Sequence, residues 1–155
     1  MAILNIRKED DPILRKTSRP VEEITPRIKT LIADMIETMR AANGCGLAAV
    51  QVGILRRIVV IEVEEGTVYT LINPRIVAKA GKQEETEGCL SLPGKWGITR
   101  RPSSVIVRFI DENGKEAELR GEGLLARAIC HETDHLDGKL FTDAMIRDVS
   151  NEVKN

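Results

Sequence analysis

The chain has 155 residues, of which 42% are hydrophobic and 30% charged, and this size predicts one compact domain over residues 1–155. Its 23 basic and 24 acidic residues nearly cancel, so the overall charge does not favour nucleic acid or anionic lipid as a partner. No apolar run approaches the roughly 20 residues of a membrane span, and the first residues lack the apolar stretch of a secretory signal. Together with an odd number of cysteines, three, these observations predict a soluble protein of the reducing cytoplasm.

The first predicted elements are an amphipathic helix and a hairpin. Thr25 and Pro26 form an N-cap and first-turn pair, and apolar residues then recur at helical spacing until Gly44. β-Branched runs follow over 57–63 and 68–72, separated by a glycine turn. This change of pattern predicts two antiparallel strands after the helix.

A second hairpin and a final helix complete the predicted fold. Strand-like runs over 104–110 and 115–120 flank the pair Asn113-Gly114, a dipeptide that tolerates the positive φ of a tight turn. A helical apolar pattern then covers 124–136 and ends before Asp137-Gly138. Helix, strands and helix in this order predict an α+β domain with antiparallel or mixed sheets.

Both histidines of the chain lie in the final predicted helix, in the run His131-Glu132-Thr133-Asp134-His135. Residues four apart share one helical face, so the two imidazoles can converge on one metal ion. Glu132 is then close enough to act on a water at that ion. This H-E-x-x-H pattern indicates a catalytic metal site, which normally takes a third protein ligand.

Several residues are candidates for that third ligand. Glu152 is a carboxylate but lies in a short polar tail over residues 144–155, which we expect to be frayed. Cys130, directly before the first histidine, points about 100° away around the helix, so we expect it to pack in the core. Cys45 and Cys89 are the better candidates, and spacing alone leaves both open.

The run Gly44-Cys45-Gly46-Leu47-Ala48-Ala49 formally fits a glycine-rich dinucleotide loop. Such a loop must follow a strand and open a helix, whereas this run follows a predicted helix and precedes a strand-like run. We therefore interpret these glycines as backbone that approaches a ligand or a ligating residue closely.

Three segments together resemble the signature motifs of the peptide deformylases, in order and in spacing. They are Gly44-Cys45-Gly46-Leu47-Ala48-Ala49-Val50-Gln51, Glu87-Gly88-Cys89-Leu90-Ser91 and His131-Glu132-Thr133-Asp134-His135-Leu136. The resemblance extends from about Ile6 to Asp143. It implies a peptide-deformylase-like fold, in which sheets pack around a C-terminal helix that carries the two histidines.

The resemblance also implies one divalent metal ion per chain, bound by Cys89, His131 and His135, with a water in the open position. Ferrous iron is the metal expected in the cell, while Zn²⁺, Ni²⁺ or Co²⁺ are expected to fit the same ligands. A thiolate and two imidazoles suit several of these ions, so iron is implied by the family and not by ligand chemistry.

The implied reaction is hydrolysis of the formyl group from the formyl-methionine of nascent polypeptides, which releases formate. Glu132 is expected to act as general base toward the metal-bound water and then as acid toward the leaving amine. The Gln51 side-chain amide and the Leu90 backbone N–H are expected to stabilise the developing oxyanion.

The substrate is expected to pair with exposed backbone and to place its methionine in an apolar pocket. The residues implied in substrate binding are Gly44, Cys45, Gly46, Gly88, Leu125 and Ala128. Nascent formyl-methionyl peptides are the expected partners, with transient proximity to the ribosome. Neither direct nucleic-acid binding nor membrane binding is expected.

Two other functions share part of this pattern. A zinc endopeptidase would use a carboxylate as third ligand and would tolerate the loss of Cys89. A non-catalytic metal-binding module would close its site with four protein ligands. Among neighbouring residues, Asp134 is expected to orient a partner or to be solvated, Trp96 to cover the cleft or to pack in the core, and Arg100-Arg101 to be surface charge.

Overall fold

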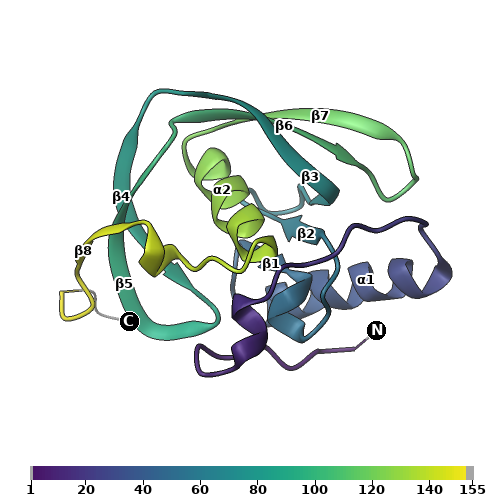
Figure 1. Cartoon of the computed structure of the whole chain (residues 1–155), viewed down its shortest axis with the longest axis horizontal. Helices are drawn as coiled ribbons and strands as arrows, with labels where there is room; N and C mark the ends of the chain where they lie inside the picture. Colours follow the sequence, from purple (N-terminus) through teal and green to yellow (C-terminus); the bar gives the residue numbers. More distant parts are fainter. Residues whose placement is uncertain (1, 153–155) are drawn as a thin grey trace.

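The computed structural model describes residues 2–152 as two antiparallel sheets with a helix between them (Figure 1). The five-stranded sheet has the order β1 (Gly46–Ala48), β2 (Ile58–Ile61), β3 (Tyr69–Ala80), β6 (Ser104–Ile110), β7 (Glu116–Glu122). The three-stranded sheet has the order β4 (Gln83–Cys89), β5 (Leu92–Arg101), β8 (Met145–Asp148). The helices are α1 (Pro26–Ala41) and α2 (Leu124–Leu136), with 3₁₀ turns at Pro12–Arg15, Ala49–Val52 and Phe141–Asp143. The predicted α+β class is confirmed.

Helix α1 begins as the sequence predicts. The Thr25 side chain accepts a hydrogen bond from the backbone N–H of Ile28, and Pro26 occupies the first turn. Its buried face, which includes Met35 and Met39, packs with apolar residues of β1 and β2. This packing fixes α1 against the five-stranded sheet.

The two predicted hairpins are confirmed as β2–β3 and β6–β7. However, β3 continues to Ala80, whereas the sequence predicted an end at 72. The ladder is interrupted between Ile72 and Arg75, where Asn73 has a φ of 52°, and this irregularity accommodates Pro74 inside the strand. Beyond it β3 pairs with β6, so one long strand joins both hairpins into one sheet.

The sequence did not predict the three-stranded sheet. β4 and β5 form a hairpin, and β8 pairs with β5 on its other side. The expectation of a frayed tail is therefore wrong for residues 145–149, since Met145–Asp148 is a strand and Val149 is buried. Backbone pairing with β5, which the local sequence does not reveal, orders this segment.

Helix α2 lies at the centre of the molecule, and both sheets and a turn contact it (Figure 1). Ala126, Ile129 and Leu136 pack with apolar side chains of the five-stranded sheet. Complete burial of a side chain such as Ile129 stabilises the fold by about 1.5–3 kcal/mol. The opposite face of α2 carries the histidines. Within residues 2–152, no helix combines the length and apolarity needed to span a membrane.

Candidate active site

A cavity of about 520 Å³ lies where the edges of the two sheets meet α2. Residues 42–46, which lead into β1, form one wall of the cavity. The β4–β5 hairpin forms the opposite wall, and α2 forms a third side. β1 and β4 are both edge strands of their sheets. The cavity is therefore bordered by backbone that has no further strand paired to it.

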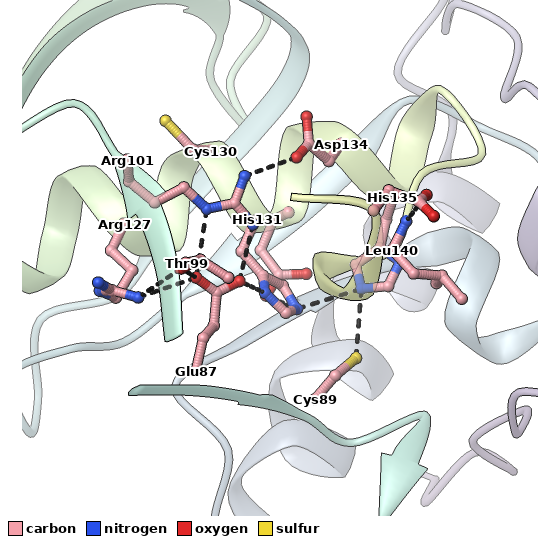
Figure 2. Close-up of polar contacts among 12 residues, drawn as sticks. Glu87, Cys89, Thr99, Arg101, Arg127, Cys130, His131, Asp134, His135 and Leu140 are labelled. Carbon is pink, nitrogen blue, oxygen red and sulfur yellow. Dashed lines mark hydrogen bonds and ion pairs between the residues drawn. The ribbon is translucent and has the colours of Figure 1, made fainter. Parts of the chain in front are cut away.

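Cys89, His131 and His135 direct their donor atoms toward one point at this cavity, and all three atoms lie within 4.8 Å of one another. The Nε2 atoms of the two histidines are 3.2 Å apart, and Cys89 Sγ lies 3.4 Å from His135 Nε2 (Figure 2). A tetrahedral metal site with ordinary bond lengths separates two imidazole nitrogens by about 3.3 Å and a nitrogen from a sulfur by about 3.6 Å. The observed separations fit such an ion.

The other candidates for the third ligand lie elsewhere. Cys45 lies in the cavity wall but is not among the three converging residues, and burial raises the pKa of its thiol. Cys130 is buried in the core cluster with its sulfur directed away from the histidines (Figure 2), which confirms its predicted packing role. Glu152 forms an exposed ion pair with Arg147.

Glu87 connects the metal-ligand candidates to a buried polar cluster, defined here as Glu87, Thr99, Arg101, Arg127 and His131. The Glu87 carboxylate contacts His131 Nδ1 and accepts hydrogen bonds from Arg101 Nη2 at 2.7 Å, Thr99 Oγ1 at 2.7 Å and Arg127 Nη1 at 2.9 Å. Burial opposes ionisation, but the bonds from His131 and Arg101 lower the pKa of Glu87 well below its usual range. The ionised carboxylate can only accept, so His131 Nδ1 carries the proton and Nε2 faces the cavity.

Arg101 connects this cluster to a further residue of α2, Asp134. Its guanidinium also donates to Asp134 Oδ2 at 2.7 Å, so Asp134 orients a partner although its side chain is 30% exposed. The prediction that Arg100-Arg101 is surface charge is correct for Arg100 and wrong for Arg101, whose side chain is 6% exposed. The buried carboxylate of Glu87 and the partly exposed one of Asp134 compensate the charge of Arg101 and make its burial tolerable.

Glu132 lies in the cavity wall on α2, next to the histidines. Its Oε1 atom is buried and has no hydrogen-bond partner within residues 2–152. Burial is the main cause that raises the pKa of Glu132 to about 7. Gly46 allows its close approach, because a Cβ at Gly46 would lie 2.5 Å from Glu132 Oε2.

The two predicted oxyanion donors lie in the same cavity wall. Gln51 is buried, its Oε1 accepts from Ala48 N–H, and its Nε2 donates to Ser91 Oγ at 3.1 Å and lies 3.6 Å from Cys89 Sγ. Leu90 directly follows Cys89 at the end of β4. Both residues therefore lie beside the converging donor atoms.

The structure brings most of the predicted substrate-binding residues together. The cavity wall includes Gly44, Cys45, Gly46, Gly88 and Ala128. The prediction that Leu125 lines the substrate pocket is corrected. Leu125 packs against the core beside Gly121, and Leu124 lines the cavity instead. Leu124, Ala128 and His131 lie on the same face of α2, because they are spaced by four and three residues. Leu125 is rotated by about 100° from Leu124 and therefore faces the core.

A family model described as polypeptide deformylase matches residues 3–151. The chain belongs to the polypeptide deformylase family. A curated peptide deformylase from Alkaliphilus metalliredigens is 57% identical over 148 residues, which cover 96% of this chain and 100% of that protein. Among solved structures, the peptide deformylase from Legionella pneumophila has a TM-score of 0.90 at 43% identity, covering 92% of this chain and 86% of that one. The peptide deformylase from Synechococcus elongatus, solved in complex with actinonin, has a TM-score of 0.91 at 42% identity, covering 96% and 82%.

Membership of the deformylase family confirms the predicted enzyme class, a hydrolase that removes the formyl group from formyl-methionyl nascent peptides. The family is metal-dependent, and the Cys/His/His group agrees with that dependence. In this deformylase chain, the local sequence does not reveal that Thr99, Arg101 and Arg127 surround Glu87. Their signal was weak, because single polar residues in a strand or helix do not reveal that they are buried.

Proposed function

We propose that Cys89, His131 and His135 bind one divalent metal ion, ferrous iron in the cell, and that Glu132 moves the protons of deformylation. The observation that carries this proposal is the convergence of a sulfur and two imidazole nitrogens at separations of 3.4 and 3.2 Å beside a buried carboxylate. When bound, a divalent ion would supply Lewis acidity that lowers the pKa of water and polarises a carbonyl oxygen.

Glu132 is the proposed general base and acid. It removes one proton from the attacking water while the water oxygen bonds to the formyl carbon. It then returns that proton to the amine nitrogen as the carbon–nitrogen bond breaks, which yields formate and a free α-amine. Burial raises the pKa of the Glu132 carboxyl in the metal-free protein, which makes this group a stronger proton acceptor than an exposed carboxylate.

Gln51 and Leu90 are the proposed donors to the oxyanion. Negative charge builds on the formyl oxygen as water attacks, and donors fixed in advance stabilise it without reorganisation. Gln51 is fixed because its Oε1 is bonded to the backbone N–H of Ala48. Its Nε2 reaches Cys89 Sγ and Ser91 Oγ, so this amide N–H lies at the proposed reaction centre.

The peptide part of the substrate is proposed to lie between the two edge strands. Gly46 belongs to β1 and Gly88 to β4, and both line the cavity. An extended peptide can pair with such edges through main-chain hydrogen bonds, which do not depend on side-chain identity. This binding mode supports action on many different nascent chains. The proposed place of action is the cytoplasm, with transient proximity to the ribosome where such chains emerge.

Two cysteines of the same cavity provide a matched test of the ligand assignment. Cys89→Ala is expected to lose bound metal and to lower formate release by more than the roughly 100-fold that outer partners of a metal site cost. Cys45→Ala is expected to retain one metal per chain and most of the activity. Normal metal content in Cys89→Ala would contradict the proposal and would favour a carboxylate-ligated endopeptidase.

The proposed iron requires a separate experiment, because the ligand set suits several ions. Protein purified anaerobically from cells is expected to contain ferrous iron by metal analysis. After metal removal, reloading with Fe²⁺ is expected to restore formate release from a formyl-methionyl tripeptide. Isolation with stoichiometric zinc and no gain of activity from Fe²⁺ would contradict the assignment of iron.

A further inference from the structure

The last turn of α2 is closed partly by local hydrogen bonds and partly by donors from distant segments. The backbone N–H of Asp137 donates to the carbonyl of Asp134, and Gly138, whose φ is 74°, donates to the carbonyl of His135. The carbonyl of Leu136, the final residue of the helix, accepts instead from two residues far away in the sequence. Carbonyls at a helix end need such outside donors, because they have no partner within the helix.

The N-terminal segment, defined here as residues 15–21, supplies the first of these donors and runs past the end of α2 (Figure 1). The backbone N–H of Ser18 donates to the Leu136 carbonyl at 2.8 Å, and Ser18 is buried. The segment also packs against Gly138, where the carbonyl oxygen of Arg15 leaves no room for a Cβ. The end of α2 is therefore in direct contact with the N-terminal segment.

Arg57, directly before β2, supplies the second donor. Its Nη1 lies 3.2 Å from the Leu136 carbonyl oxygen, 3.0 Å from Asp137 Oδ1 and 3.3 Å from the Ser18 carbonyl oxygen. One guanidinium nitrogen thus bonds both to the end of α2 and to the N-terminal segment. A cation at this place also interacts favourably with the partial negative charge at the C-terminal end of a helix.

The backbone of Arg57 is itself held on both sides. Its N–H donates to the Arg19 carbonyl at 2.9 Å, and its carbonyl accepts from the Asn73 N–H at 2.8 Å. The Asn73 side chain forms two further hydrogen bonds with the backbone of Val21, each of 2.8 Å. Arg57 is therefore a fixed base from which its guanidinium holds the end of α2.

His135, one of the proposed metal ligands, directly precedes Leu136 in this last turn. The other histidine ligand, His131, is oriented by Glu87 through Nδ1. By contrast, Nδ1 of His135 is buried and has no hydrogen-bond partner within residues 2–152. The place of the His135 ring therefore depends on packing and on the backbone at the end of α2, which is the part that Arg57 contacts.

We propose that Arg57 is a positioning residue for His135, which it keeps in place by fixing the last turn of α2 against the N-terminal segment. The inference rests on the proposed function, because it assumes that His135 binds the metal ion. Arg57 is not among the residues that line the cavity. An effect of its substitution on the metal must therefore pass through α2.

The test measures the affinity of each protein for Co²⁺ under anaerobic conditions, by competition with a chromophoric chelator. The visible absorption of the bound Co²⁺ reports its coordination geometry, and unfolding in guanidinium chloride reports stability. Arg57→Ala removes the guanidinium, and Arg57→Gln keeps a neutral donor as a milder change. Arg57→Lys keeps the positive charge, which suits this place because a single nitrogen makes all three contacts.

Two control variants separate positioning from other effects. Arg56→Ala removes the neighbouring arginine, whose side chain donates to the Leu55 carbonyl. Thr25→Ala removes the N-cap of α1 and lowers stability without touching α2.

Arg57→Ala is expected to bind Co²⁺ about tenfold more weakly than wild type and to change the visible spectrum. Arg57→Gln is expected to lose less affinity, and Arg57→Lys to stay within about threefold of wild type. Arg56→Ala is expected to resemble wild type. Thr25→Ala is expected to unfold at lower denaturant concentration while it keeps the affinity and the spectrum of wild type.

Wild-type affinity and spectrum in the folded Arg57→Ala and Arg57→Gln variants would overturn the inference, as would equal losses in Arg57→Ala and Thr25→Ala. His135→Ala separates this failure from failure of the proposed function. Loss of Co²⁺ binding in His135→Ala, beside unchanged binding in the Arg57 variants, would overturn the positioning role alone. Unchanged binding in His135→Ala would contradict the ligand assignment and this inference with it.

Discussion

Glu87 accepts a hydrogen bond from Nδ1 of His131, and this contact directs the other ring nitrogen of His131 toward Cys89 and His135. The substitution Glu87→Gln makes residue 87 a weaker acceptor for the His131 Nδ1–H and removes the negative charge of the carboxylate. We expect a loss of metal affinity of about 10–100-fold, the usual cost of changing a partner of a ligating histidine. Competition with a chromophoric chelator measures this loss.

Thr99→Val is the milder control for that variant, because it removes one neutral donor to Glu87 and one acceptor of Arg127, while both arginines keep their hydrogen bonds to Glu87. Its metal affinity is expected to fall less than that of Glu87→Gln. Equal affinities in wild type and Glu87→Gln, with unchanged circular dichroism, would show that Glu87 does not orient His131.

Metal binding is expected to depend on pH. Burial alone would lower the pKa of His131, but the charges and hydrogen bonds of Glu132, Cys89 and Glu87 raise it well above the usual value in the metal-free protein. Burial, assisted by His131, lowers the pKa of His135, which is therefore already neutral. His131 must lose its Nε2 proton to bind metal, while Nδ1 keeps the proton that it donates to Glu87. Affinity for Zn²⁺ therefore falls as pH falls, by about tenfold per pH unit for this proton below the raised pKa.

Calorimetry in two buffers of different ionisation enthalpy counts the protons that the ligands release, which include the thiol proton of Cys89 as well as that of His131. The expected result is net proton release on metal binding at pH 7. Affinity that is constant between pH 6 and pH 8, with no buffer dependence of the heat, would contradict the protonated state of His131.

Gly46→Ala tests the close approach of β1 to Glu132. The added Cβ would lie 2.5 Å from Glu132 Oε2, so the carboxylate must move by about 1 Å, a displacement that can cost on the order of 100-fold in rate. We expect kcat to fall while metal content and KM for a formyl-methionyl tripeptide change little. Steady-state kinetics with metal analysis provide the measurement, and wild-type kcat would show that Glu132 tolerates displacement.

Local patterns allowed prediction of those elements whose signals are contained in a short stretch of sequence. Helix α1 has its cap and apolar period, and the β6–β7 hairpin has its turn dipeptide. The metal-ligand candidates on α2 followed from the four-residue spacing of the histidines, while Cys89 was identified by resemblance alone, since spacing did not separate it from Cys45.

The parts of the fold and the site that the sequence did not predict depend on contacts between distant segments. β4 is rich in glutamate and glutamine, so its strand conformation comes from pairing with β5 and not from its own propensity. Likewise, Arg101 resembles its exposed neighbour Arg100 in sequence, and only the fold places Glu87 and Asp134 around it. β8 was missed for the same reason, because its ladder partner lies about 50 residues earlier.

The most direct test of the account is formate release from a formyl-methionyl tripeptide by wild type and Glu132→Gln, both loaded anaerobically with ferrous iron. We predict turnover by wild type and a loss of about 10²–10⁴-fold in Glu132→Gln, with one metal ion retained per chain. Glu132→Gln activity equal to that of wild type would contradict the role of Glu132 as the proton-transferring group. Absence of formate from metal-loaded wild type would contradict the proposed function itself.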